Sequence, residues 1–461
     1  MRGASEHRGI AFRPALEQAA AIRRGEIGAR ELAELYLERI DRFNPLLNAF
    51  WITTPEIALA NNVLVRTGPL ANVCVSIKDL VPLAGHRHTL GSRALSENTA
   101  SIDGFVVQRL REEGCRILGK TTTPEFGGRP VTDYGLHGAC RNPWNQEHTA
   151  GGSSGGAASA LAAGLCAMSH GSDGGGSVRV PAACCGVVGL KPSRGRISQG
   201  PEVGEAWSGL LTDGVLARTV ADAAAGLDAM VGHLLGDPYW AETSERFLDA
   251  ITLPPRRLRV AFTTHAQVTV DPEIVECVRR VANACESFGH KVVEDGPATA
   301  ELRDPQVTLF AASMGALPVQ DLTLLDPVNV RTIEYGRGIS AADYLRGLAE
   351  VHRLSRQIIT FWDNHDILIT PTVTRPAPRV GEMGSDPRTA GDEHLDWLSF
   401  TYPYNCTGQP AISLPLGMHS SGLPIGVQLV GRPRGDVEVL ALGAQLEKML
   451  PWSDQIPEGW D

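Results

Sequence analysis

The sequence GGSSGGAASALAAG spans residues 151–164, and GSDGGGSVRVPAACCGVVGLKPSRGRIS follows at residues 171–198. Each segment opens with glycines and serines and continues into compact apolar sequence, which would not be expected of a flexible linker. Consecutive glycines allow backbone N–H groups to converge on one point, because no Cβ atom obstructs them. The two segments therefore predict a site that stabilises a negatively charged group.

Three kinds of site use glycines in this way. A phosphate cradle is disfavoured, because neither segment continues into G-K-[ST] or forms a G-x-G-x-x-G turn between strand and helix. An α/β-hydrolase nucleophile elbow formally matches residues 151–155 (GGSSG), but it must follow a buried strand, and residues 145–150 (NQEHTA) are polar. An acyl-transfer site is favoured, in which a serine attacks a carbonyl and the N–H groups of residues 174–177 stabilise the oxyanion.

A serine nucleophile needs a base, and no histidine in this chain stands in a distinctive setting. A lysine can act as the base when burial lowers its pKa towards neutrality. Lys78 is the best candidate because it ends the apolar run VCVSI at residues 73–77. Lys120 and Lys191 are competitors by the same reasoning, and the residue pattern alone does not choose among the three lysines.

Composition predicts a soluble cytoplasmic protein. The chain has 461 residues, with 42 basic and 52 acidic side chains and a formal charge of −10, which argues against a nucleic-acid or membrane partner. Nine scattered cysteines indicate reduced thiols, and the N-terminus lacks the apolar core of a secretory signal. His86 and His88 form an H-x-H pair with no further ligand in view, so we expect no metal and no cofactor.

Strand-like and helix-like segments alternate along the chain, which is typical of an α/β fold. We expect a strand at residues 73–77, a helix at 101–113 and a second strand at 115–118. Residues 258–294 resemble a βαβ unit around a helix at 272–288. No linker divides the chain, so we expect one domain over residues 1–461, with a polar, poorly ordered tail at residues 1–10.

These motifs together resemble the amidase signature family of serine hydrolases. The agreement extends from the two glycine segments to VSIKDL (75–80), GKTTTPEFG (119–127) and FTYPYNCTGQPAISLPLG (400–417), and so covers nearly the whole chain. The resemblance implies a single α/β/α domain around a large, twisted, mixed and mostly parallel sheet. It also implies hydrolysis of carbon–nitrogen bonds through a Ser–cis-Ser–Lys triad.

The resemblance assigns a role to each motif residue. In the triad, Ser177 is the nucleophile, Lys78 is the general base, and Ser153 bridges them and follows a cis peptide bond. The oxyanion hole consists of the N–H groups of Gly174, Gly175, Gly176 and Ser177. The loop that borders the acyl pocket contains Gly127, Gly128 and Arg129. The supporting hydrogen-bond positions are Ser154, Asp173 and Arg179.

The substrate is expected to be a neutral, hydrophobic amide. The pocket-forming segment at about 300–400 is the least motif-like part of the chain, and it contains the apolar residues Phe310, Met314, Leu317, Leu322, Tyr335, Tyr344 and Trp397. The overall pattern resembles bacterial amidases of the nylon-oligomer (6-aminohexanoate cyclic dimer) hydrolase and urethanase type. This implies linear, cyclic or aryl amides, with carbamates and esters as further substrates, for a monomer or homodimer. The alternative is the amidase subunit of a glutamine-dependent tRNA amidotransferase.

Overall fold

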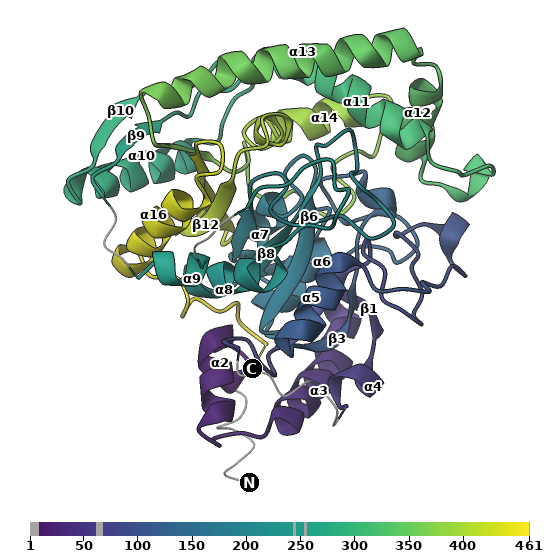
Figure 1. Cartoon of the computed structure of the whole chain (residues 1–461), viewed down its shortest axis with the longest axis vertical. Helices are drawn as coiled ribbons and strands as arrows, with labels where there is room; N and C mark the ends of the chain where they lie inside the picture. The colour runs from purple at the N-terminus through teal and green to yellow at the C-terminus, as the bar shows by residue number, and fades with distance from the viewer. Residues whose placement is uncertain (1–8, 61–67, 243–245, 253–255, 461) are drawn as a thin grey trace.

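An eleven-stranded sheet forms the centre of the computed structural model, which describes residues 9–60, 68–242, 246–252 and 256–460 (Figure 1). The strand order is β1-β3-β2-β6-β8-β7-β12-β13-β11-β9-β10. The strands of this sheet are β1 (Phe50–Thr53), β2 (Cys74–Lys78), β3 (Arg116–Thr121), β6 (Met168–Asp173), β7 (Val188–Lys191), β8 (Thr212–Ala217), β9 (Arg259–Phe262), β10 (Lys291–Glu294), β11 (Ile367–Pro371), β12 (Ala411–Met418) and β13 (Pro424–Gly431). A separate hairpin pairs β4 (Arg141–Asn142) with β5 (Asn145–Thr149).

Helices surround the sheet, and α11, α12 and α13 gather at the end of the molecule opposite α2 and α3 (Figure 1). The main helices are α2 (Ala15–Arg23), α3 (Ala29–Leu47), α5 (Phe105–Glu113), α6 (Gly155–Ala162), α7 (Arg179–Cys185), α8 (Val220–Met230), α10 (Pro272–Ser287), α11 (Arg303–Gly315), α12 (Pro327–Arg337), α13 (Ala341–Ile359), α14 (Ala390–Trp397) and α16 (Asp436–Met449). The shorter ones are α4 (Pro55–Ala58), α9 (Phe247–Ala250) and α15 (Pro403–Cys406).

The prediction of one large mixed sheet in an α/β fold is confirmed, but the expectation that it is mostly parallel needs correction. Among the described strands, parallel pairing occurs in two groups, β3–β2–β6 and β11–β9–β10. The other neighbours are antiparallel, including the whole centre from β6 to β11. One physical reason is local, because β12 returns directly into β13 through a short turn, and such a turn makes antiparallel neighbours.

The parallel group β3–β2–β6 positions the two glycine segments. Because β2 and β6 are adjacent and parallel, their carboxyl ends meet at one edge of the sheet, where ligands bind in α/β folds. Lys78 is the last residue of β2, and the glycine loop 174–177 directly follows β6. The structure therefore brings together two motifs that lie about a hundred residues apart in the sequence.

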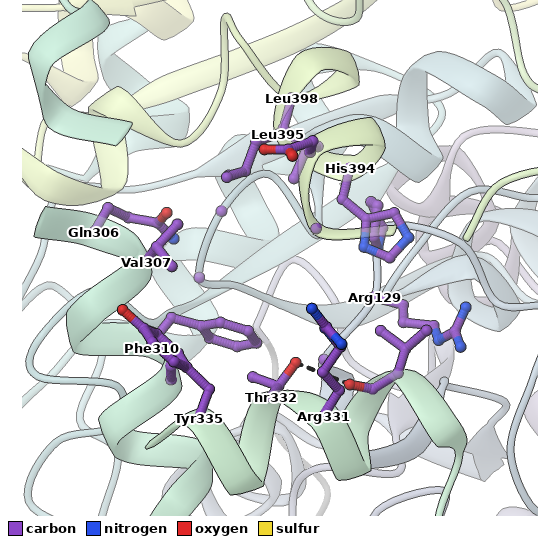
Figure 2. Close-up of a pocket in the computed structure, with 18 of the residues that line it drawn as sticks. Arg129, Gln306, Val307, Phe310, Arg331, Thr332, Tyr335, His394, Leu395 and Leu398 are labelled. Atoms are coloured by element: carbon purple, nitrogen blue, oxygen red, sulfur yellow. Dashed lines mark hydrogen bonds between the residues drawn. The ribbon is translucent and has the colours of Figure 1, made fainter. Parts of the chain in front are cut away.

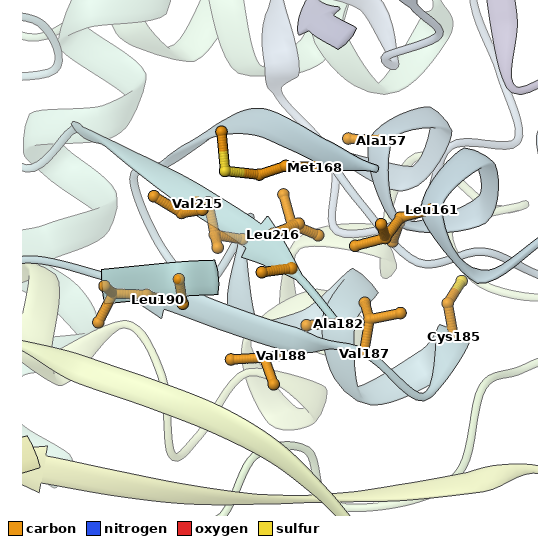
Figure 3. Packing of buried hydrophobic residues seen from close by; sticks show 14 of the residues in the cluster. Ala157, Leu161, Met168, Ala182, Cys185, Val187, Val188, Leu190, Val215 and Leu216 are labelled. Carbon is orange, nitrogen blue, oxygen red and sulfur yellow. The ribbon is translucent and has the colours of Figure 1, made fainter. Parts of the chain in front are cut away.

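Helix α6 explains why the first segment consists of glycine, alanine and serine. Every residue of α6 is buried, so each side chain must be small enough to fit between packed layers. A Cβ on Gly156 would lie only 2.5 Å from the backbone nitrogen of Thr122, so the helix packs directly on main chain there. Ala157 and Leu161 pack with Met168, Val215 and Leu216 of the neighbouring strands (Figure 3).

The predicted elements are found with shifted boundaries. The strand at 73–77 becomes β2 and includes Lys78, whereas the helix at 101–113 begins only at Phe105, after Gly104. The βαβ unit is confirmed, since β9 and β10 flank α10 and pair in parallel. Within the predicted tail at 1–10, residues 1–8 lie outside the described residues, but Ile10 is buried in the core, so the tail prediction fails there.

Two composition-based expectations concern the whole chain. All nine cysteines lie in the described part of the chain, where each is free and buried. No helix among the described residues combines the length and the apolar character that crossing a bilayer requires.

Candidate active site

Lys78 and Ser153 are in direct contact behind the glycine loop. The Lys78 Nζ donates to Ser153 Oγ at 2.8 Å, to Ser172 Oγ at 3.0 Å and to the Ser172 carbonyl at 3.2 Å. The peptide bond between Gly152 and Ser153 is cis, as the resemblance implied. Burial of the ammonium group lowers the pKa of Lys78 to about 7, although Asp173 and Asp213 act in the opposite direction. A large fraction of Lys78 is therefore neutral at pH 7 and able to accept a proton.

Ser177 reaches the cavity that the glycine loop borders. It is 9% exposed, whereas Ser153 is 1% exposed and Lys78 is fully buried. Ser177 lines a cavity of about 520 Å³, and neither Ser153 nor Lys78 does. The Ser154 N–H donates to the Ser177 carbonyl at 3.1 Å, so the two serine segments touch. Of these three predicted residues, only Ser177 is placed to meet a bound molecule.

Three N–H groups of the glycine loop, rather than the predicted four, have no protein acceptor among the described residues. Gly174, Gly175 and Ser177 line the cavity, and none of their N–H groups donates to a protein acceptor among the described residues. The Gly176 N–H instead donates to Asp173 Oδ1 at 2.8 Å. Gly176 is therefore corrected from an oxyanion donor to a residue that shapes the loop. Sequence reasoning could not separate these amides, because four consecutive small residues look equivalent.

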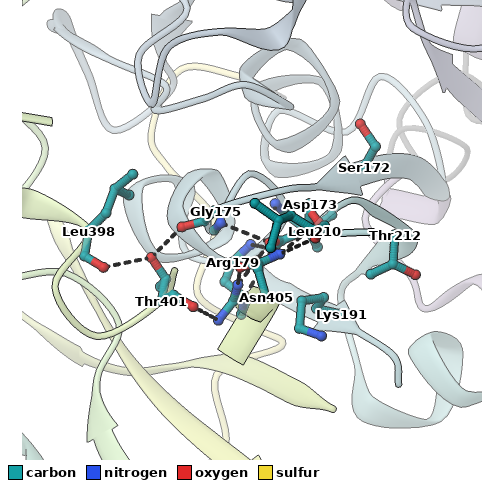
Figure 4. A network of polar contacts seen from close by, with 12 residues as sticks. Ser172, Asp173, Gly175, Arg179, Lys191, Leu210, Thr212, Leu398, Thr401 and Asn405 are labelled. Atoms are coloured by element: carbon teal, nitrogen blue, oxygen red, sulfur yellow. Dashed lines mark hydrogen bonds and ion pairs between the residues drawn. The ribbon is translucent and has the colours of Figure 1, made fainter. Parts of the chain in front are cut away.

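A buried ionic network holds the loop in this shape (Figure 4). The Asp173 carboxylate accepts from the Val178 N–H at 3.1 Å and from Arg179 Nη2 at 2.8 Å. Arg179 also donates to Gln428 Oε1 at 2.7 Å, and Asn405 Nδ2 donates to Asp173 Oδ1 at 2.9 Å. These charge-assisted bonds hold the pKa of Asp173 well below its usual range, mainly through Arg179, despite complete burial. The supporting positions predicted at Asp173 and Arg179 thus form one network.

Replacing Arg179 with methionine should strongly destabilise the fold. The change leaves the Asp173 carboxylate buried without its cation, which costs about 3–5 kcal/mol of unfolding free energy in comparable pairs. Equilibrium denaturation in guanidinium measures this loss. The matched control is Arg379→Met, which breaks the exposed pair of Arg379 with Glu147 and should change the midpoint little. Equal stabilities of the two variants would contradict the account of the network.

The loop Gly127–Arg129 forms part of the cavity wall and is joined to α12. Gly127, Gly128 and Arg129 all line the cavity, and a Cβ on Gly127 would lie 3.2 Å from Ser153 Oγ. The Arg129 guanidinium pairs with Asp326, donates to the Gly384 carbonyl at 3.0 Å and lies 4.2 Å from the Tyr134 ring centroid. The Arg129 guanidinium is therefore held by contacts within the protein, and the Asp326 carboxylate compensates its positive charge.

The two competing lysines have other partners. Lys120 Nζ pairs with the Asp79 carboxylate and donates to the Arg87 carbonyl at 2.9 Å. Burial also lowers the pKa of Lys191 to about 7, but Lys191 Nζ donates to the Pro192 carbonyl at 3.1 Å. Neither contacts a serine of the glycine segments in the described residues. Of the three lysines, Lys78 is therefore the one seen to contact a serine of these segments in the described part of the chain, a choice that the residue pattern alone left open.

The segment predicted to form the pocket supplies most of the cavity wall (Figure 2). Phe310 and Tyr335 line this cavity as expected. Of the other apolar residues named for this segment, Met314 and Leu317 line a neighbouring cavity, Leu322 and Tyr344 pack in hydrophobic clusters, and Trp397 is buried in the core. Amino-acid type therefore did not separate wall residues from core residues.

Sequence reasoning missed several residues that contribute to this site. Trp207 and His394 line the cavity, and His170 Nε2 lies 2.8 Å from Asp213 Oδ1 just behind Lys78. Burial and the nearby Arg129 lower the pKa of His394 to about 3, so its imidazole is neutral at ordinary pH. The His394 Nε2 atom is buried and has no hydrogen-bond partner among the described residues. None of these residues lies within a recognisable motif.

Comparison with known proteins gives consistent matches along the chain. The family model described as Amidase matches residues 31–440. The 6-aminohexanoate-cyclic-dimer hydrolase of Paenarthrobacter ureafaciens is 37% identical, covering 97% of each chain. A solved structure of a 6-aminohexanoate cyclic dimer hydrolase with its substrate gives a TM-score of 0.93 at 35% identity, covering 97% of this chain and 99% of that one. A bacterial aryl acylamidase of the amidase signature family gives 0.87 at 28% identity, with the same coverage.

Proposed function

Because this chain belongs to the amidase family, whose enzymes hydrolyse carbon–nitrogen bonds, we propose that it cleaves neutral, hydrophobic amides through a serine acyl-enzyme. The observation that carries the proposal is the 2.8 Å hydrogen bond from Lys78 to Ser153, beside the cavity that Ser177 lines. A buried lysine with a pKa of about 7 is a suitable base at neutral pH. The proposal includes a single domain over residues 1–461.

The proposed reaction begins with neutral Lys78. Lys78 accepts a proton from Ser153, which accepts one from Ser177, whose oxygen attacks the substrate carbonyl. The N–H groups of Gly174, Gly175 and Ser177 stabilise the oxyanion, because they are free and line the cavity. The tetrahedral intermediate collapses when Ser153 returns a proton to the departing amine. Water, activated through the same relay, then hydrolyses the acyl-enzyme.

The cavity wall supports an uncharged substrate. Its apolar side chains come from several parts of the chain and include Trp207, Val307, Phe310, Tyr335, Leu395 and Leu398. The charged residues that also line it are Arg129, Arg331 and Arg388 against Glu334 and Asp392, and the charge of Arg129 is compensated by Asp326, so no net charge selects an ionic substrate. The relatives named for 6-aminohexanoate cyclic dimer and for aryl acylamides support cyclic and aryl amides as the substrate class.

Carbamates are a further proposed substrate class, because they present the same carbonyl with a comparable amine leaving group. A substrate panel on the isolated chain tests the proposal with aryl anilides, cyclic lactams, primary amides, aryl carbamates, esters and glutamine. We expect turnover of the anilides and lactams without a cofactor. The proposal includes a cytoplasmic location and a monomer or homodimer. If glutamine is the one substrate of the panel that is turned over, and ammonia is released from it only after a partner protein is added, the result would instead support the amidotransferase-subunit alternative.

The pH dependence follows from the pKa of Lys78. Only the neutral amine can accept a proton, so kcat/KM should rise with pH through about 7 and then reach a plateau. Burial disfavours the charged ammonium and therefore places this rise more than two pH units below that of an exposed lysine. Initial rates with an anilide from pH 5 to 10 measure it. A rise centred near pH 10 would contradict the role of burial.

A further inference from the structure

A second cavity of about 370 Å³ adjoins the one that contains Ser177. The two cavities lie on either side of a common wall, and neighbouring residues of the same segments line them. Gly127 and Phe310 border the first cavity, whereas Phe126 and Met314, close to them in the sequence, border the second. Of the described residues, Trp207 alone lines both cavities. The Trp207 side chain therefore belongs to the wall between them.

The indole of Trp207 is fixed firmly in this position. A Cβ on Gly174 would lie 2.4 Å from Trp207 Cε3, so the ring rests directly on the backbone of the glycine loop. The ring also meets Phe310 edge to face, with centroids 4.9 Å apart. Trp207 and Ser208 both adopt left-handed backbone conformations, with φ of 54° and 58°, which is rare for such residues. The Tyr344 hydroxyl of α13 donates to Ser208 Oγ at 3.1 Å and holds this turn.

We propose that Trp207 determines how long an acyl chain the enzyme accepts, and that the second cavity, which the indole separates from the first, is a compartment for neutral apolar acyl chains. This inference rests on the proposed function. The indole lies against Gly174, one of the three N–H donors assigned to the carbonyl oxygen. An acyl chain that runs from the carbonyl past Gly174 therefore meets the ring. Removing the ring joins the two cavities.

The lining of the second cavity supports this ligand class. Its wall is mainly apolar and includes Leu80, Phe105, Phe126, Met314 and Leu317. Its polar residues include Asp213, whose carboxylate accepts from Gln199 Nε2 at 2.9 Å and lies 2.8 Å from His170 Nε2. These side chains occupy the carboxylate, so it offers little to a ligand and would repel an acyl chain that ends in a second carboxylate. The compartment thus suits an uncharged hydrocarbon chain.

The test compares wild type and Trp207→Ala on p-nitroanilides with acyl chains from acetyl to dodecanoyl. In the variant, the ratio of kcat/KM for decanoyl over acetyl should rise at least about tenfold, since each newly buried methylene favours binding by about fourfold. Trp207→Leu, which keeps an apolar side chain, should shift the ratio in the same direction by less. In the Trp207→Ala background, Leu317→Trp refills the second cavity and should abolish the gain.

Two outcomes would overturn the inference. One is an unchanged chain-length profile in both folded single variants. The other is a gain confined to acetamides with long N-alkyl groups, which would place the amine rather than the acyl chain beside Trp207. Labelling of Ser177 by a short fluorophosphonate in the same variants distinguishes a failure of the Trp207 proposal from a failure of the proposed function. A labelled Ser177 with an unchanged profile rejects only the role of Trp207, whereas absence of the label rejects the acyl-enzyme itself.

Discussion

The Ser177→Ala variant should lose at least about 10⁴-fold of the wild-type kcat for an anilide, while its circular dichroism and thermal midpoint stay close to wild type. The loss is expected because the covalent route needs the Ser177 oxygen, and no other serine among the described residues combines a place in the cavity with a contact to the Ser153 segment. Ser177 is 9% exposed, and removing its single hydroxyl leaves no cavity large enough to disturb the fold.

A control serine separates this effect from a general loss of hydroxyl groups. Ser399 donates to the Asp396 carbonyl at 2.8 Å and does not line the cavity, so Ser399→Ala should keep the wild-type kcat. If Ser177→Ala retains more than a tenth of the wild-type rate, with contaminating enzyme excluded by purification from an inactive host, the nucleophile assignment is wrong.

Lys78→Met should reduce kcat/KM by about 10²–10⁴-fold and remove the rise near pH 7. Methionine keeps most of the length and apolar stem of lysine but cannot accept a proton from Ser153. The reduction should be greatest for amides with poor leaving groups, because these depend most on proton return to the amine. Rate measurements across pH, with anilides of graded leaving-group pKa, check both expectations.

Lys191→Met provides a matched control for the loss of Lys78. Lys191 is equally buried and its pKa is likewise lowered to about 7 by burial, but its Nζ donates to a backbone carbonyl. The Lys191 variant should therefore keep the rise near pH 7. If instead this rise disappears in Lys191→Met and persists in Lys78→Met, the assignment of the base must be exchanged between the two lysines.

Local patterns predicted much of the framework. The apolar run before Lys78 indicated a buried strand, which is present as β2. The compact apolar sequence after the first glycines indicated an ordered segment rather than a linker, and this segment is α6. The direction of β7 relative to β12 was not predictable, because these two partners lie far apart in the sequence. The hydrophobic periodicity of a segment indicates whether that strand is buried, but it says little about the direction of the neighbouring strand.

The candidate site likewise has features that could be predicted from the sequence and features that could not. The family resemblance proposed roles for Lys78, Ser153 and Ser177 before the fold was known, whereas the residue pattern alone left three lysines open. Which N–H groups of the glycine loop are free could not be predicted, because this depends on the position of the Asp173 carboxylate. That carboxylate accepts from the Gly176 N–H, so Gly176 is not among the free donors. Trp207 lies in no motif and gains its place only through contacts with Gly174 and Phe310.

The most direct test of the central claim is to label the nucleophile covalently, by attack of its oxygen on a fluorophosphonate with loss of fluoride, and to identify the modified residue. The wild-type chain is incubated with a fluorophosphonate, digested and analysed by peptide mass spectrometry, with Ser177→Ala treated in parallel. The account predicts one adduct, on Ser177 in the peptide that contains Gly174 to Arg179, and no adduct in the variant. A stable adduct on Ser153, on another residue, or on the Ser177→Ala chain would contradict it.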